Sequence, residues 1–254
     1  MADPHIHIPY RKIEDYLYFL NKHQLNLEIY FSASVLDSLK NSDVIKFKER
    51  LDYNPAISIH GPFMDLSPGA LDSKVRAITI ERFLSIFDIA EILKPNVVVF
   101  HSGYEKWKYS HRIDKWLEGS LVTWNHILPI AIERGIKIAI ENIFEDEPTN
   151  LRLLMEKMGS QYFGICFDTG HFNLFSKTPL EEWLNQLKPY ILELHLHDNN
   201  KNLDEHKAIG DGTFDFDILF TALTGKNVLY TLEAHTPEDV IKSLERLKSY
   251  NLSA

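Results

Sequence analysis

Short apolar runs alternate with longer amphipathic stretches along the whole chain of 254 residues. Each run is rich in Ile, Val, Leu and Phe, which is typical of a strand, and the stretch after it repeats apolar residues at helical spacing. In 73–93, for example, that spacing connects Val75, Ile78, Phe83, Ile86 and Ala90. The expected strands are 5–9, 25–31, 56–63, 96–101, 137–143, 162–168, 191–197 and 228–234, and the expected helices are 12–23, 34–51, 73–93, 115–134, 149–158, 180–187, 214–223 and 237–250.

Eight strand–helix units in a chain of this length predict an α/β fold, a single (β/α)8 TIM barrel. Nearly continuous apolar strands are expected when both faces of a parallel sheet are buried. Local signals agree, because Thr149 and Thr236 are placed to cap helices and Pro237 suits a first helical position. The glycines that stand between a helix and the next strand are Gly135, Gly159 and Gly225. No linker or charge run marks a boundary, so residues 1–254 are expected to form one domain.

Amino-acid composition and net charge indicate which kinds of partner the protein is expected to bind. With 44% hydrophobic and 25% charged residues, the chain has an ordinary globular composition. Its net charge of −9 does not attract nucleic acid, which is therefore not a favoured partner, or an anionic membrane. The single Cys166 lies in an apolar run and is expected to be a buried thiol. No leader-like or membrane-length segment is visible, so we expect a cytoplasmic protein; the sequence leaves the oligomeric state open.

Six of the expected strands end in a histidine or an acidic residue. These residues are His60, His101, Glu141, Asp168, His195 and Glu233. The C-terminal ends of TIM-barrel strands meet at one mouth, so these side chains should converge there. A lone histidine at a strand end is usually a hydrogen-bonded structural residue, but a carboxylate after a buried apolar run needs a cation or strong donors. Six such ends together predict a shared site for a divalent metal such as zinc, manganese or iron.

Further candidates lie close to these strand ends. His171 follows Asp168, and Asp204 with His206 lies in the loop after 191–197, where a solvated loop is the alternative interpretation. The residues that could orient metal ligands, or be plain surface residues, are His197, Asp198 and His235. The residues that could contact a substrate are Asn142, Asn173, Lys201 and Lys207. No role is predicted for His5 or His7.

Several segments match a known superfamily. They are 100–103 (Phe-His-Ser-Gly), 164–171 (Gly-Ile-Cys-Phe-Asp-Thr-Gly-His), 195–198 (His-Leu-His-Asp), and 204–206 with 210–212 (Asp-Glu-His and Gly-Asp-Gly). Through them, and from the third strand onward, the chain resembles the xylose-isomerase-like TIM barrels, which include endonuclease IV and many sugar or sugar-phosphate isomerases and epimerases. His197 departs from endonuclease IV, which usually has Asn there, and the DNA-penetrating loops of that enzyme cannot be identified.

The resemblance implies two alternative sets of metal ligands. The isomerase branch typically holds one metal, which implies Glu141, Asp168, His195 and Glu233 as its ligands here. The endonuclease IV branch holds three metals. It implies His60 and His101 on the first, Asp168, His195 and Glu233 on the second with Glu141 bridging these two, and His171, Asp204 and His206 on the third.

Two chemistries fit these ligands. Phosphoester hydrolysis benefits from two or three clustered zinc, manganese or iron ions, which would give the additional histidines a function. Isomerisation or epimerisation needs one ion of the Mn, Mg or Co type and two carboxylates that move protons, with Glu141 and Glu233 as candidates. The number of ligands favours a metal-dependent phosphoester hydrolase acting on a small phosphorylated substrate. A sugar or sugar-phosphate isomerase or epimerase is the alternative, and a non-catalytic metal-binding barrel is a third interpretation.

Overall fold

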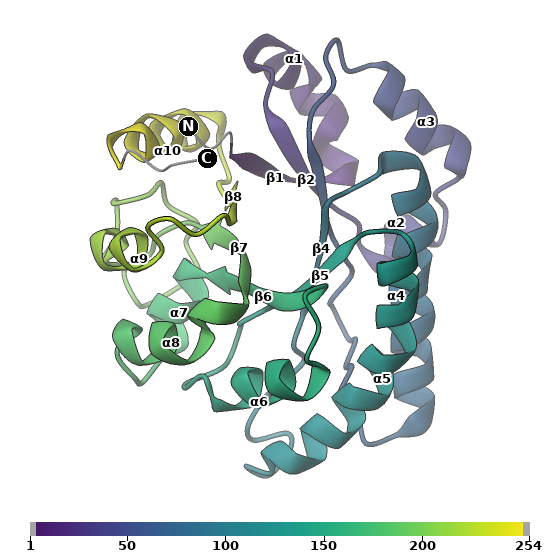
Figure 1. Ribbon diagram of the computed structural model, residues 1–254. Coiled ribbons are helices and arrows are strands. Elements are labelled where there is room, and N and C mark those ends of the chain that lie inside the picture. The colour runs from purple at the N-terminus through teal and green to yellow at the C-terminus, as the bar shows by residue number, and fades with distance from the viewer. Residues whose placement is uncertain (1–3, 251–254) are drawn as a thin grey trace.

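The computed structural model describes residues 4–250, in which eight parallel strands close into one barrel (Figure 1). The strands are β1 His5–Pro9, β2 Asn26–Tyr30, β3 Ile57–His60, β4 Val97–His101, β5 Lys137–Glu141, β6 Phe163–Asp168, β7 Ile191–Leu196 and β8 Leu229–Leu232. The helices are α1 Ile13–His23, α2 Ala33–Leu36, α3 Asn41–Glu49, α4 Ser73–Leu93, α5 Ile113–Glu133, α6 Thr149–Met158, α7 Thr169–Phe175, α8 Leu180–Leu187, α9 Phe216–Ala222 and α10 Pro237–Ser249. Short 3₁₀ turns occupy Tyr10–Lys12 and Lys188–Tyr190. The predicted (β/α)8 TIM barrel is confirmed.

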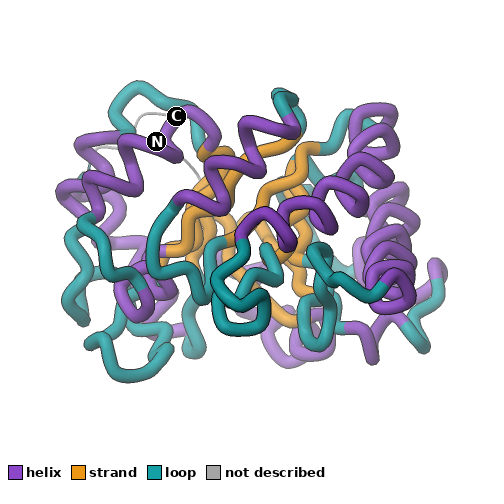
Figure 2. The backbone as a smooth tube through the Cα atoms, turned by 90° about the horizontal axis from the view of Figure 1, so that it is seen from below, coloured by secondary structure: helices purple, strands orange, loops and turns teal. Residues whose placement is uncertain are grey.

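The helices lie outside the strands and cover the outer face of the barrel (Figure 2). Leu27 and Ile29 of β2 and Ile138 and Ile140 of β5 are fully buried in the main hydrophobic core, which the barrel shares with the helices. A separate small apolar cluster contains Val97, Val99, Ala139 and the buried Cys166. Both faces of the sheet are therefore buried, as the continuous apolar strands predicted.

Polar residues occupy alternate positions on several strands, and residues two apart share one face of a strand. Glu28 of β2 pairs in register with His7 of β1 and with Ser58 of β3. His5 lies two residues before His7, and its Nδ1 is 2.8 Å from the Ser58 hydroxyl. On β3, the next position on the same face as Ser58 is His60. The interior of the barrel is thus apolar in part and polar toward the mouth, which places ionisable groups in two successive layers.

Two secondary-structure predictions are corrected. The single helix expected over 34–51 is two helices, because α2 ends after one turn and the Lys40 main-chain N–H donates to the Asp43 carboxylate at the start of α3. The short helix α7 was not predicted; it begins directly after β6, where the Asp168 carboxylate accepts from the His171 main-chain N–H at 2.6 Å. A side chain at a strand end can therefore be a helix cap at the same time.

Predicted helix ends are mostly confirmed. Thr236 caps α10 by accepting from the Asp239 main-chain N–H at 3.1 Å. The expected Thr149 cap is wrong, because Thr149 is the first residue of α6 and its hydroxyl donates to Glu147 instead. The predicted left-handed glycines all have positive φ, namely Gly135 (68°), Gly159 (53°) and Gly225 (75°).

Candidate metal centre

All nine predicted ligands converge at the mouth of the barrel. Glu141, Asp168 and His195 are on β5, β6 and β7, and Glu233 follows β8 directly. The loop after β7 adds Asp204 and His206, and α7 adds His171. The ligands form three groups of contacts, and seven of the nine also line one cavity of about 850 Å³. Residues from most of the chain therefore share one site, as the barrel topology predicted.

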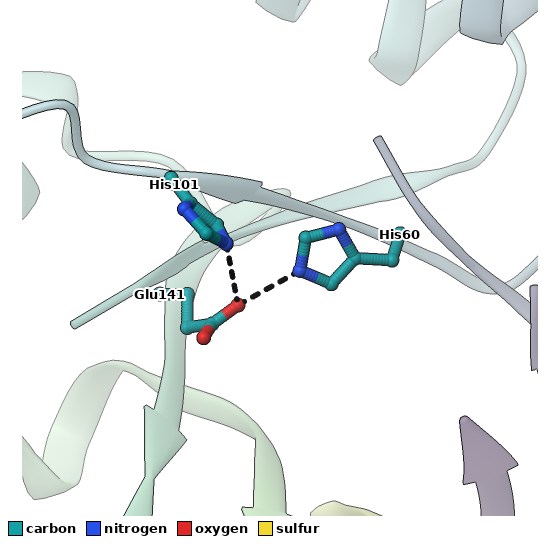
Figure 3. Close-up of side chains that lie close together, drawn as sticks. All are labelled: His60, His101 and Glu141. Atoms are coloured by element: carbon teal, nitrogen blue, oxygen red, sulfur yellow. Dashed lines mark hydrogen bonds and ion pairs between the residues drawn. The ribbon is translucent and has the colours of Figure 1, made fainter. Parts of the chain in front are cut away.

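The first group joins β3, β4 and β5. His60 Nε2 and His101 Nε2 lie 2.9 and 3.5 Å from the same Glu141 Oε2 (Figure 3). His60 Nδ1 is 2.8 Å from the Gly61 carbonyl oxygen. Because a carbonyl only accepts, Nδ1 donates to Gly61, and this bond turns Nε2 toward the carboxylate. A histidine that donates one ring N–H to a carbonyl and directs its other nitrogen toward an acidic oxygen has the orientation found in metal sites.

The central group is arranged around His195. Its Nδ1 is 3.1 Å from Glu233 Oε1, 3.5 Å from Glu141 Oε2 and 3.8 Å from Asp168 Oδ2, yet this buried atom has no hydrogen-bond partner. Its other nitrogen, Nε2, lies 3.2 Å from Glu28 Oε1. A histidine that donates one N–H to a carboxylate and turns its other nitrogen toward three acidic oxygens has the arrangement of a metal ligand. This donor set fits a divalent ion.

The third group contains His171, Asp204 and His206. Asp204 Oδ2 lies 3.4 Å from His171 Nε2 and 3.1 Å from His206 Nε2. His171 Nδ1 is 3.0 Å from Glu141 Oε1, so its ring connects this group to the first two. His197 also belongs to the site, because its Nε2 lies 3.1 Å from both Asp168 oxygens and its ring stacks on His206 at 4.0 Å.

Close packing explains why the Asp-Thr-Gly-His segment has glycine at position 170. A Cβ on Gly170 would lie 2.0 Å from a ring atom of His197. The hydroxyl of the neighbouring Thr169 donates to the His195 and His197 carbonyl oxygens, at 3.1 and 2.7 Å. This segment therefore allows α7 to approach β7 closely and places His171 beside the other ligands.

Burial and neighbouring charges act against each other in this site. Burial favours neutral carboxyls, but nearby histidines hold the pKa of Glu141 and Glu233 well below the usual range. Burial also favours neutral imidazoles, yet the surrounding acidic groups raise the pKa of His171 and His195 well above the usual range. For His101 burial prevails and lowers the pKa to about 3, although Glu141 favours the charged form. The ionised carboxylates and the neutral His101 can bind a cation as they stand, whereas His171 and His195 must each release a proton to become ligands, so metal binding at this site releases protons.

Asp198 and His235, which were predicted to orient metal ligands, contact the loop that carries Asp204 and His206. Asp198 accepts main-chain N–H groups of Asn199, Gly210, Gly212 and Phe214, at 2.8–3.1 Å, and so holds the loop that carries Asp204 and His206. The His235 ring stacks on His206 at 4.6 Å. Neither residue belongs to the groups around Glu141 described above, and both act on the loop or ring next to them.

The four residues expected to contact a substrate have other partners. Asn142 exchanges two hydrogen bonds with the Asp168 main chain, at 2.9 and 3.0 Å. Asn173 donates to Asn199 and Thr213, and Lys207 pairs with Glu205 at 2.9 Å. Lys201 is exposed. The residues that line the 850 Å³ cavity include none of these four. The structure therefore gives the two asparagines positioning roles within the loops.

Two residues with no predicted role lie inside the site. His7 Nδ1 is 2.8 Å from Glu28 Oε1 and 3.0 Å from Glu233 Oε1. Glu28, which is 0% exposed, contacts both His7 and His195. Burial would lower the pKa of His7, but Glu233 and Glu28 outweigh it and raise that pKa to about 10. The signal that could have found Glu28 is a charged residue within the strand Asn26–Tyr30, between the apolar Leu27 and Ile29.

Comparisons with known proteins identify the family of this chain. A family model described as the xylose isomerase-like TIM barrel matches residues 26–250, so the chain belongs to this family. An uncharacterized protein of Methanocaldococcus jannaschii, MJ1311, is 33% identical over 208 residues, which cover 78% of this chain and 71% of that protein.

Solved structures show the same fold over nearly the whole chain. The TTHB071 protein of Thermus thermophilus, in a crystal soaked with zinc chloride, is 26% identical and covers 98% of both chains with a TM-score of 0.81. A D-tagatose 3-epimerase-like protein is 29% identical and covers 90% of both chains with a TM-score of 0.76. Among residues 4–250, no helix combines the length and apolar character needed to cross a membrane.

Proposed function

We propose that this protein is a metal-dependent isomerase or epimerase of a small sugar or sugar phosphate. The observation that carries the proposal is the position of two glutamates, Glu141 on β5 and Glu233 directly after β8, both within 3.5 Å of His195 Nδ1 but separated by β6 and β7. Two carboxylates that approach one centre from different strands can reach different faces of one substrate. Similarity to a D-tagatose 3-epimerase-like protein supports the same chemistry.

The proton transfer would use both carboxylates. A divalent ion held by Glu141, Asp168, His195 and Glu233 would supply the positive charge that polarises the substrate carbonyl. One glutamate takes the proton from the carbon beside the carbonyl, and the electron pair moves to the carbonyl oxygen. The other glutamate returns a proton to the opposite face in an epimerisation, or one carbon along in an isomerisation. The low pKa of both carboxyls keeps the glutamate that takes the proton ionised. The glutamate that returns a proton must first receive one, and a protonated histidine beside it can supply that proton, as His7 can for Glu233 at 3.0 Å.

The cavity above these ligands suits a small substrate with an anionic group. Its volume is about 850 Å³, and part of its wall is aromatic, with Tyr30, Phe63 and Phe175. Among residues 4–250, Lys108 is the single lysine or arginine that lines it, and its ammonium group donates to the Ser67 hydroxyl at 3.1 Å. No carboxylate in that part of the chain forms an ion pair with Lys108, so its charge is available for a substrate phosphate.

A second candidate function is phosphoester hydrolysis. The specific observation in its favour is that two further groups, His60 with His101 and His171 with His206, each meet a carboxylate beside the central one. Isomerisation gives these four histidines no required metal. Hydrolysis would use the additional cations to activate water and to bind the attacking and leaving oxygens.

Metal content and substrate panels separate the two functions. Protein loaded with zinc or manganese should contain one tightly bound ion per chain if it is an isomerase, and two or three if it is a hydrolase. Proton NMR would follow conversion of ketoses and ketose phosphates, and absorbance would follow hydrolysis of bis(p-nitrophenyl) phosphate. Conversion of neither sugar class by metal-loaded protein would reject the proposed function.

Three variants refine this test. Glu233→Gln should abolish either activity, whereas His101→Ala with His206→Ala should abolish only hydrolysis. The exposed His126 on α5 provides a matched control, and His126→Ala should leave both metal content and turnover unchanged.

A further inference from the structure

A second cavity adjoins the metal centre. It has a volume of about 370 Å³ and lies between α1 and α10. It shares four residues with the 850 Å³ cavity above the predicted ligands, so these side chains stand between the two spaces: His7, Pro9, His206 and Glu233. We call the smaller space the side chamber and define it by Ile8, Tyr16, Phe19, Leu20, Val240 and His235 in addition to the four shared residues.

The side chamber exists because the barrel closes over a short seam. β1 pairs with β2 at five positions but with β8 at only two, His5 with Thr231 and Ile6 with Leu232. Beyond Ile6, β1 continues without a partner on β8, and the chain after β8 turns into α10. Figure 1 shows α1 and α10 on the two sides of this seam. The helices are thus held apart at the mouth, directly beside Glu233.

The chemistry of the chamber changes from one end to the other. Its body is mostly apolar and partly aromatic, with Tyr16 and Phe19 from α1 and Val240 from α10, and Lys12 and Thr236 add polar atoms to its wall. Its inner end is formed by imidazoles. The rings of His197, His206 and His235 form a stack, with centroids 4.0 and 4.6 Å apart and interplanar angles of 6° and 20°. The outer ring, His235, lines the chamber, so a flat group entering the chamber can extend this stack.

We propose that the side chamber binds a flat aromatic group of the same substrate whose polar head lies over the metal ligands. This inference rests on the proposed metal-dependent activity and narrows its substrate class to sugars or sugar phosphates that carry an aromatic substituent. The side chamber is large enough for an aromatic ring, because a dry cavity of roughly 150 Å³ already accepts benzene. A free ketose has no apolar group to fill this space, and an unfilled chamber would be an exposed apolar surface beside the active site.

Two hydroxamic acids test the connection between the chamber and the metal centre. Acetohydroxamic acid has a metal-binding head alone, and 3-phenylpropionohydroxamic acid adds a phenyl ring on a short linker. Calorimetric titration of zinc-loaded protein should give at least about tenfold tighter binding for the phenyl compound, since the second subsite is reached within one molecule. Equal affinities would overturn the proposal.

Substitutions on α1 and α10 test whether the phenyl ring of this compound binds in the side chamber. Val240→Phe fills the chamber and should remove the advantage of the phenyl compound without weakening acetohydroxamic acid. Leu244→Phe makes the same kind of enlargement on α10 at a residue that does not line the chamber, and should preserve the advantage. If the advantage survives Val240→Phe in folded protein, the ring binds in the larger cavity and the proposal is wrong. Tyr16→Ala, which removes a wall ring from a half-buried position, should reduce the advantage even if Val240→Phe does not fold.

A metal-free measurement separates this inference from the proposed function. Indole added to metal-free protein should shift the NMR signals of chamber residues, and Val240→Phe should weaken that binding by about tenfold or more because the ring would be overpacked. Absence of indole binding in a protein that epimerises sugars would refute the chamber proposal alone. Indole binding in a protein that converts no sugar would refute the proposed function alone.

Discussion

Glu28 is the residue whose replacement tests the construction of the metal centre most directly. It is fully buried, and its two oxygens accept from His195 Nε2, at 3.2 and 3.3 Å, and from His7 Nδ1, at 2.8 Å. Those two histidines both reach Glu233 with an Nδ1 atom, at 3.1 and 3.0 Å. Glu28 is therefore a positioning residue, because it fixes the ring that turns His195 Nδ1 toward the predicted metal.

The expected loss of metal affinity in Glu28→Gln follows from the hydrogen-bond donors that face Glu28. His195 Nε2 lies near both Glu28 oxygens, so in Glu28→Gln the amide nitrogen that replaces one of them donates and faces the His195 N–H, and the negative charge between His7 and His195 is lost. A buried donor left without an acceptor costs about 1–3 kcal/mol. If this cost destabilises the metal-bound protein, metal affinity falls roughly 10–100-fold. This is the range typical of substitutions at carboxylates that bond to metal-bound histidines.

A matched carboxyl provides the control for this experiment. Glu193 is equally buried and accepts from the Thr231 hydroxyl, but burial and Glu28 raise its pKa well above the usual range, so it is a neutral acid that glutamine imitates closely. Zinc affinity, measured by competition with a chromophoric chelator, should fall in Glu28→Gln and change less than about threefold in Glu193→Gln. Unchanged affinity in folded Glu28→Gln would refute the positioning role.

Three further results are expected. Glu145→Ala should lower the free energy of unfolding in urea by about 2–4 kcal/mol, because the buried carboxylate accepts from Ser102, Ile143 and Asn150; an unchanged urea midpoint would contradict this. Burial raises the pKa of the Cys166 thiol well above its usual value, so iodoacetamide at pH 8 should label it only in denaturant, and rapid labelling of native protein would show a different packing. Removing zinc with a chelator should lower Tm, since free zinc at 1,000 times its Kd stabilises by about 4 kcal/mol, and an unaltered Tm would argue against a structural contribution of metal.

Much of the site could be predicted from strand ends. Glu141 and Glu233 were identified because a carboxylate after a buried apolar run requires a compensating group, and both lie among histidines in the structure. The barrel topology then brought residues together that are distant in sequence, without any knowledge of side-chain geometry. The xylose-isomerase-like resemblance is confirmed by the family match, and the loop pair Asp204 and His206 lies beside the other predicted ligands, with Asp204 still exposed to solvent.

The interior of the barrel could be predicted from the sequence less completely. His7 and Glu28 were missed because they lie within strands, whereas polar residues were sought only where strands end. Alternation in Asn26-Leu-Glu-Ile-Tyr30 and His5-Ile-His-Ile-Pro9 shows that polar and apolar residues face opposite sides. In a closed barrel the polar side must be the interior, so a strand that alternates in this way predicts buried ionisable groups that pair across the barrel.

The same alternation explains why sequence neighbours of the ligands were poor candidates for substrate contacts. A residue directly after an inward ligand has its side chain on the other face of the strand. Asn142 follows Glu141 and bonds to the main chain of β6, and Asp198 follows His197 and holds the loop after β7. Polar residues at such positions satisfy main-chain groups that the irregular loop ends leave unpaired. They therefore fix the direction of the neighbouring ligand, and substrate contacts are better sought on loops that face the cavity, such as those with Phe63 and Lys108.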